Sequence, residues 1–118
     1  MIDLAPEHLR TVHRLVAGQA PECEVRAFGS RVTGKAKPYS DLDILLIGPS
    51  RLPLARVAAV REAFAELELP IRVDVVDWHS ISENFRSITS AHNALLQNPG
   101  GLREDSEKLE LASPASLL

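Results

Sequence analysis

Several features are scarce or missing in this 118-residue chain, and each absence excludes a class of protein. Cys23 is the only cysteine, so the chain has no internal disulfide and no cysteine-rich zinc site. The N-terminal residues lack the basic flank and apolar stretch of a signal peptide. The longest aliphatic run, residues 44–47, is too short to cross a bilayer. We therefore expect a cytoplasmic protein with no membrane partner.

Excess positive charge is also missing. The formal net charge is -3 and the sequence pI is about 5.8, which argues against a strongly basic face for bulk nucleic-acid binding. Nucleic acid is then expected only as an acceptor in a reaction. With 45% hydrophobic and 25% charged residues, the chain has the composition of a globular protein with one core. We expect one domain over residues 1–101 and a tail over residues 102–118, which is charged and then rich in Ser and Pro.

Helix-like and strand-like segments alternate along the chain. Helical spacing predicts a helix from Pro6 to about Gly18 and another over residues 54–67. Apolar segments over residues 24–28, 41–47 and 71–77 predict three strands. This order favours an α/β (α+β) fold, a small mixed sheet with helices packed against it.

The segment that follows the third predicted strand has a helix-start signal. Ser80 and Glu83 have the spacing of a capping box. Phe85, Ile88, His92 and Leu95 would lie along one side of the helix that it opens, and the turn at residues 98–101 would end it.

An acidic pair stands where the second predicted strand begins. Side chains two apart in a strand point the same way, so Asp41 and Asp43 share a face with Cα atoms roughly 6.5–7 Å apart. Carboxylates at that spacing can bind one hard cation such as Mg²⁺, and they repel each other without it. A third carboxylate on a neighbouring strand would allow two ions about 3.5–4 Å apart. Asp74 and Asp77 face opposite sides of their strand, and Asp74, inside the apolar run, is the predicted third acid.

A small-residue turn precedes the acidic pair. Gly29 lacks a Cβ where the backbone comes close to a ligand or takes a positive φ. If a short helix begins at Arg31, Ser30 is its N-cap, and a phosphate there meets unpaired N–H groups. Arg31 would add a charge-assisted contact. An isolated Gly-Ser or Asp-x-Asp is usually only a turn, a cap or a strand end, and the order of the two motifs is what favours a site.

These residues resemble a known family. Gly29-Ser30, then Ser40-Asp41-Leu42-Asp43 and the later Asp74-Val75-Val76-Asp77, are similar to the signature of the DNA polymerase β-like nucleotidyltransferases. The short length resembles the minimal nucleotidyltransferase (MNT) proteins of that superfamily. The resemblance covers residues 24–97.

The resemblance implies a palm-like core and the transfer of a nucleoside monophosphate from an NTP, expected to be ATP, to an acceptor hydroxyl. It implies that Gly29, Ser30, Arg31 and Ser40 bind the nucleotide, and that Asp41, Asp43 and Asp74 are catalytic and bind two Mg²⁺ ions. Such proteins are often paired with a small helical partner of the HEPN type, as its antitoxin or as the catalytic half of a two-component enzyme.

Two alternatives stay open. The chain could be a binding module that neutralises a helical partner by contact alone. The acids could instead belong to a receiver domain or a DxD phosphohydrolase. A receiver needs a lysine after a late strand, where none stands, and the phosphohydrolase pattern has a Thr soon after its second Asp, where this chain has Ile44.

Overall fold

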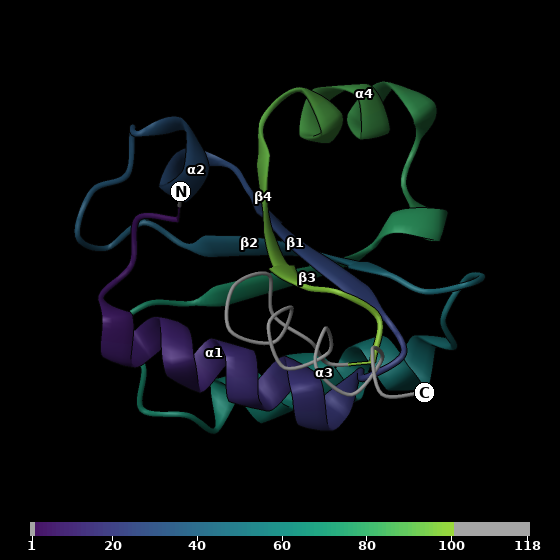
Figure 1. Ribbon diagram of the computed structural model, residues 1–118, viewed down its shortest axis with the longest axis horizontal. Coiled ribbons are helices and arrows are strands. Elements are labelled where there is room, and N and C mark those ends of the chain that lie inside the picture. The colour runs from purple at the N-terminus through teal and green to yellow at the C-terminus, as the bar shows by residue number, and fades with distance from the viewer. Residues whose placement is uncertain (1, 101–118) are drawn as a thin grey trace, which may run out of the picture.

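The computed structural model describes residues 2–100 and forms a four-stranded sheet with helices on both sides (Figure 1). In chain order the elements are α1 (Pro6–Gln19), β1 (Glu24–Phe28), α2 (Ser30–Thr33), β2 (Leu42–Ile47), α3 (Leu54–Ala65), β3 (Val73–Asp77), the 3-10 turn η1 (Trp78–Ser80), α4 (Glu83–Ala91) and β4 (Asn93–Gln97). The predicted class, a mixed sheet with packed helices, is confirmed. The predicted tail, residues 102–118, lies outside the described residues.

The sheet combines antiparallel and parallel pairing. Its strand order is β3-β2-β1-β4. The central strand β1 runs antiparallel to both β2 and β4, whereas β2 and β3 run parallel. Parallel neighbours need a long crossover, and α3 supplies it between β2 and β3. The two central strands, β1 and β2, are therefore held on both sides by other strands.

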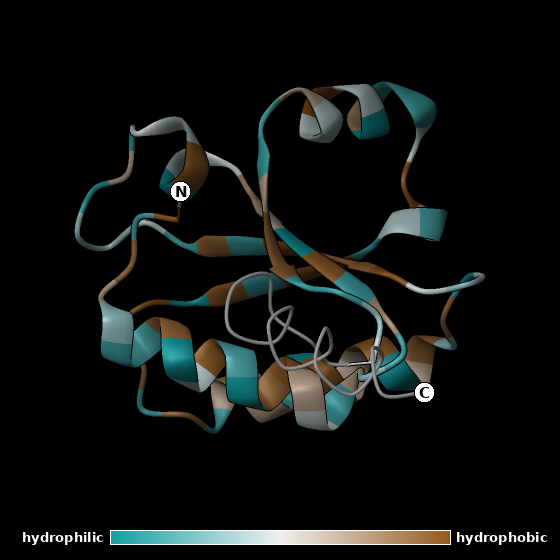
Figure 2. Cartoon of the chain, viewed as in Figure 1, coloured by the Kyte–Doolittle hydropathy of each residue, from teal (hydrophilic) through white to brown (hydrophobic). Residues whose placement is uncertain are grey.

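The hydrophobic core lies between the sheet and two helices. Figure 1 shows α1 and α3 against one face of the sheet, and Figure 2 shows apolar residues on the sides of these helices that meet it. The core side chains come from α1, α3, β2 and β3: Val12, Val16, Val57, Val60, Phe64, Leu42, Ile44, Leu46 and Val75. The two helices predicted from Pro6 and over residues 54–67 are thus confirmed, although α3 ends at Ala65, two residues before its predicted end. No helix within residues 2–100 combines the length and apolarity needed to cross a bilayer.

The outer edge of β3 is covered by an arginine of α3. Arg61 donates from Nη2 and Nε to the carbonyl of Val75, at 2.8 and 3.2 Å. A strand at the edge of a sheet has backbone groups without a neighbouring strand, and a long cationic side chain can satisfy them. The guanidinium of Arg61 therefore supplies hydrogen bonds that a neighbouring strand would otherwise give to this edge.

The predicted end of the last helix is wrong. α4 ends at Ala91, His92 is extended (φ -142°, ψ 105°), and Asn93–Gln97 form β4 along β1. The side-chain Nδ2 of Asn93 donates to the carbonyls of Thr89 and Ser90, which gives hydrogen-bond partners to carbonyls in the last turn of the helix. Pairing with the open edge of β1 and burial of Leu96 outweigh the helical spacing.

The predicted start and buried side of that helix also differ from the structure. The N-cap is Ser82, whose Oγ accepts from the amide of Phe85 at 3.1 Å, so the predicted capping box is not formed. Ile88 is 60% exposed rather than part of a buried stripe. α4 instead buries Thr89, and the ring of Phe85 packs edge-to-face on Phe28 of β1 with centroids 5.7 Å apart.

Candidate functional site

One row of side chains crosses the sheet on the face opposite α1 and α3. Asp74 of β3 pairs with Asp43 of β2, Asp43 pairs with Phe28 of β1, and Phe28 pairs with Asn93 of β4. Paired residues of neighbouring strands point to the same face, and parallel or antiparallel neighbours lie about 4.7–4.9 Å apart. The predicted convergence of Asp43 and Asp74 on one face therefore follows from the strand register.

Asp41 lies one residue before β2, on the same side of the strand as Asp43 by alternation. Its Oδ2 is 3.7 Å from Nη2 of Arg72, whose side chain is 80% exposed. An ion pair this open to solvent holds a carboxylate weakly. Asp41 thus keeps a carboxylate available beside the other two acids.

The electrostatics of the row agree with its geometry. Burial and, to smaller extents, the negative charges of Asp74 and then Asp41 together raise the pKa of Asp43 from 3.8 to about 6. Asp43 is half-buried, whereas Asp74 on the outer strand is exposed. The expected repulsion among the three acids is therefore a property of the folded chain.

Gly29 makes room for this carboxylate. Its φ is +82°, a backbone conformation that side-chain-bearing residues rarely adopt, and a Cβ built on it would lie 2.4 Å from Oδ2 of Asp43. The sequence predicted either a positive φ or a close approach to a ligand, and the positive φ is confirmed. The atom close to Gly29 is the carboxylate oxygen of Asp43, so this turn and the acidic pair are adjacent in space and belong to one site.

Ser30 is not the N-cap of the short helix that follows. Gly29 is the N-cap, and its carbonyl accepts from the amides of Val32 and Thr33 at 3.0 and 3.1 Å. The positive φ of Gly29 starts the helix one residue earlier than predicted. Ser30 and Arg31 fill the first turn, where backbone N–H groups have no acceptor within the helix.

The side chain of Arg31 does not point into this site. It is 7% exposed and donates to backbone carbonyls, among them that of Ser40 at 3.0 Å. The hydroxyl oxygen of Ser40 accepts from the amide of Lys37 at 2.8 Å. The expectation that the guanidinium of Arg31 contacts phosphate is therefore not supported by its position.

Asp77 lies on the other face, as alternation predicts. It is 4% exposed, and its carboxylate accepts from the amides of Leu52 and His79 at 3.0 and 3.1 Å. These bonds tie the loop before α3 to the end of β3 and cap the turn η1. Asp77 is thus a structural acid, and Asp74 is the one that faces Asp43.

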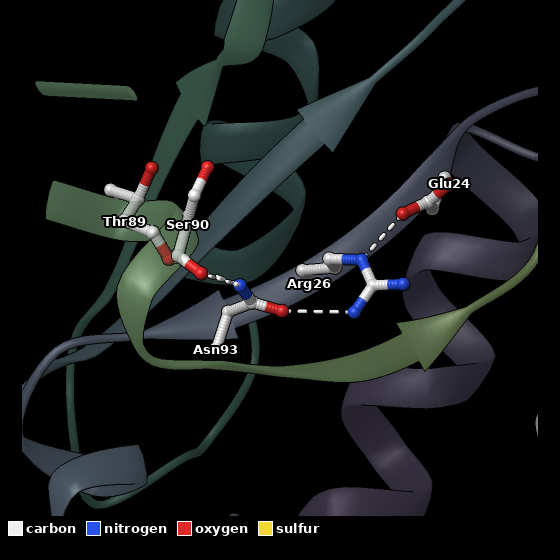
Figure 3. Close-up of polar contacts among 5 residues, drawn as sticks. All are labelled: Glu24, Arg26, Thr89, Ser90 and Asn93. Atoms are coloured by element: carbon white, nitrogen blue, oxygen red, sulfur yellow. Dashed lines mark hydrogen bonds and ion pairs between the residues drawn. The ribbon is translucent and has the colours of Figure 1, made fainter. Parts of the chain in front are cut away.

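Further along the acidic face, sequence reasoning missed a polar cluster beneath α4. A cavity of about 300 Å³ is lined by Glu24, Arg26, Leu45, Ile47, Trp78, Thr89, Ser90 and Asn93. Figure 3 shows the guanidinium of Arg26 between the Glu24 carboxylate and Oδ1 of Asn93, the latter at 2.9 Å. Arg26 and Asn93 thereby join α4 and β4 to β1. The contact between Arg26 and Asn93 could not be predicted, because residues 93–97 were expected to be helical. Alternation along β1 does place Arg26 on the same face of the sheet as Phe28.

The acids fit a hard divalent cation by their chemistry. Three carboxylates without nitrogen or sulfur ligands are the kind of donor set that Mg²⁺ prefers, completed by water and substrate oxygens. In residues 2–100, however, no group of three or more His, Cys, Asp or Glu side chains is placed so that it holds a metal ion by itself. An open set of mutually repelling carboxylates is consistent with ions that arrive with a substrate.

Comparison with known proteins assigns the family. A family model described as "Nucleotidyltransferase domain" matches residues 9–96. The chain is 45% identical over 87 residues to a probable protein adenylyltransferase MntA of Haemophilus influenzae, which covers 74% of this chain and 76% of that protein.

Solved structures share the fold. A toxin-antitoxin crystal structure with AMP-PNP matches with a TM-score of 0.67 and 20% identity, over 92% of this chain and 85% of that one. A tri-AMPylated Shewanella oneidensis HEPN toxin in complex with its MNT antitoxin matches at 0.62 and 19%, over 94% and 83% of the two chains. A minimal nucleotidyltransferase structure matches at 0.61 and 28%, over 77% and 95%. By its match to the family model and to the Haemophilus relative, the chain is a member of the nucleotidyltransferase domain family.

Proposed function

We propose that this chain is an adenylyltransferase that transfers AMP from ATP to a hydroxyl group of a helical HEPN-type partner. The observation that carries the proposal is the row of Asp43 and Asp74, with Asp41 beside it and Gly29 against it. The name of the Haemophilus relative supports the adenylyl group, and the AMP-PNP and AMPylated HEPN titles of the matched structures support the nucleotide and the partner.

Asp41, Asp43 and Asp74 are the proposed ligands of two Mg²⁺ ions. Bound ions would neutralise the triphosphate and the leaving group and lower the pKa of the attacking hydroxyl. Asp43 lies between the other two acids, since Asp74 is its partner across the strands and Asp41 is two residues before it. Loss of Asp43 is therefore expected to affect both ions.

The exposed position of Asp74 suits it to the acceptor side of the reaction. The acceptor oxygen attacks the α-phosphorus of ATP, the bond to the β-phosphate oxygen breaks, and pyrophosphate leaves. The hydroxyl proton passes to the carboxylate of Asp74, which solvent and a partner can reach from the open edge of the sheet. Asp43, which is half-buried, is less accessible to a protein acceptor.

The turn after β1 is the part of the site that is proposed to bind the phosphates of ATP. The amides of Ser30 and Arg31 lie in the first turn of α2, where backbone N–H groups have no acceptor within the helix, and in this proposal they donate to phosphate oxygens. The hydroxyl of Ser40 accepts one bond and keeps its own proton to donate. In this proposal Arg31 contributes its amide and not its guanidinium.

The proposed setting is a two-component system in the cytoplasm, in which the chain is the antitoxin of its HEPN-type partner. A single domain with the acids at an open sheet face holds no separate acceptor-binding domain within residues 2–100. The partner would then supply its own acceptor hydroxyl, and modification would neutralise it.

The test uses the chain co-purified with the protein encoded beside it. The pair is incubated with Mg²⁺ and ATP labelled at the α-phosphate, or at the γ-phosphate in a parallel sample. We expect only the α-label to reach the partner. Asp41→Asn, Asp43→Asn and Asp74→Asn should each lower the rate by roughly 10²–10³ or more, because charge-stabilising groups are lost. Asp77→Asn is the matched control and should keep transfer.

Transfer of the γ-label, or wild-type transfer by Asp43→Asn, would contradict the proposal. Growth assays with the same variants separate it from the alternative of a contact-only binding module. If neutralisation of the partner survives in variants that no longer transfer AMP, the chain acts by contact. If neutralisation and transfer are lost together, modification is the biological task.

A further inference from the structure

The guanidinium of Arg31 is enclosed by backbone carbonyls from two segments, the N-terminal segment at Asp3 and the turn over residues 37–40. Its Nη1 donates to Asp3 at 2.7 Å, and its Nε donates to Ser40 at 3.0 Å. Its Nη2 donates to Lys37 and Pro38 at 3.2 and 3.1 Å. Of the five N–H donors of a guanidinium, these bonds use four. A side chain that is 7% exposed and bonded in this way has little capacity left for a phosphate.

The carbonyls belong to segments that border the proposed site. Ser40 immediately precedes Asp41, and the turn over residues 37–40 is closed by the amide of Ser40 on the carbonyl of Lys37, at 3.0 Å. The Asp3 segment also contacts the backbone of α2, since its amide donates to the carbonyl of Arg31 at 2.7 Å. One residue thus connects the N-terminal segment, the first turn of α2 and the turn that leads into the acidic pair.

We propose that Arg31 is a positioning residue whose guanidinium holds the turn over residues 37–40 against α2 and thereby sets the position of Asp41. The planar fork of arginine can reach several carbonyls at once, whereas the ammonium of lysine is a single point charge. Gly29 leaves room for the carboxylate of Asp43, and Arg31 holds the chain that precedes Asp41. The metal-binding part of this inference rests on the proposed function.

The first measurement needs neither metal nor nucleotide. Hydrogen–deuterium exchange of the backbone amides is compared in the wild type, Arg31→Lys and Arg31→Met. We expect amides of residues 37–41 to exchange at least about tenfold faster in both variants, while amides of β1 and β2 keep wild-type protection. Arg72→Met is the matched control: it removes an arginine beside Asp41 that is 80% exposed, and residues 37–41 should stay as protected as in the wild type.

The second measurement is the affinity for Mn²⁺ alone, by calorimetry. Residues that orient a metal ligand typically contribute 10–100-fold to affinity, so Arg31→Lys and Arg31→Met should each bind Mn²⁺ at least about tenfold more weakly. Arg72→Met should bind it equally or more tightly, since a competing cation is gone. Arg31→Lys keeps the charge, so its failure to restore affinity indicates that geometry is required.

The outcomes are distinct. Unchanged exchange at residues 37–41 in both variants overturns the proposal, as does wild-type Mn²⁺ affinity combined with weaker ATP binding, which would make Arg31 a phosphate ligand. If the wild type binds no Mn²⁺ alone, the titration is repeated with AMP-PNP present. Absence of Mn²⁺ binding there contradicts the proposed function, and the exchange data then decide the role of Arg31 alone. If Arg31→Met does not fold, Arg31→Lys carries both measurements.

Discussion

Replacing Asp43 with asparagine should stabilise the ligand-free protein at neutral pH. Burial, together with Asp74 and Asp41, raises the pKa of Asp43 from 3.8 to about 6. The folded chain therefore binds the proton of this carboxyl more tightly than the unfolded chain does. The free energy of unfolding is highest below about pH 4 as far as this group is concerned, and it falls as the pH rises through about 6.

The size of the effect follows from the same values. A pKa change from 3.8 to about 6 corresponds to about 3 kcal/mol as an upper bound. Asp43 is only half-buried, and solvent screening reduces this to about 1–2 kcal/mol. An asparagine does not titrate, so Asp43→Asn should melt several degrees above the wild type at pH 7–8 and equally with it near pH 4.

Thermal melts followed by circular dichroism, in EDTA and from pH 4 to 8, measure this difference. Asp77→Asn is the control, because its carboxylate accepts two backbone bonds and its loss should lower the melting temperature at neutral pH. Excess Mg²⁺ should then raise the melting temperature of the wild type and leave that of Asp43→Asn unchanged. A variant that melts below the wild type at pH 8, or by the same margin at pH 4 and 8, would refute the reasoning.

Two further predictions use matched pairs. Gly29→Ala should destabilise the chain more than Gly34→Ala does. Both glycines have φ near +80°, but only a Cβ at position 29 would lie against the carboxylate of Asp43. Chemical denaturation of both variants measures the difference in the free energy of unfolding. Equal losses would mean that this carboxylate simply moves aside. Ile88→Glu should weaken association with the neighbouring-gene product by tenfold or more, whereas Leu54→Glu on α3 should not, and calorimetric titration compares these two exposed side chains. The reverse order would place the partner on the α3 side.

The local parts of the site could be predicted from the sequence, and the parts that depend on distant contacts could not. Alternation within a strand was enough to place Asp74 and Asp77 on opposite faces. The cap of α2 was misplaced by one residue because Gly29, with its positive φ, is the N-cap and Ser30 already lies in the helix. Nothing local indicates that the guanidinium of Arg31 is enclosed by carbonyls from residues 3 and 37–40.

The last strand shows the same limit. The spacing of Phe85, Ile88, His92 and Leu95 is helical, and the segment that contains them is half helix and half strand. Its second half pairs with an edge of β1 that is about 70 residues away in sequence. Only the assembled sheet offers that edge, so tertiary pairing overrides the local pattern.

Asp74 lies on β3, an edge strand with a neighbouring strand on one side only. The number of carboxylates in the site therefore depends on how often this strand is paired with β2. Edge strands open at lower free energy than central ones, so fraying of β3 withdraws Asp74 while Asp41 and Asp43 stay in place on β2. The bonds from Arg61 to Val75, one residue beyond Asp74, oppose that fraying. Arg61, on the opposite side of the sheet, is thus expected to raise the share of molecules in which Asp74 lies beside Asp41 and Asp43.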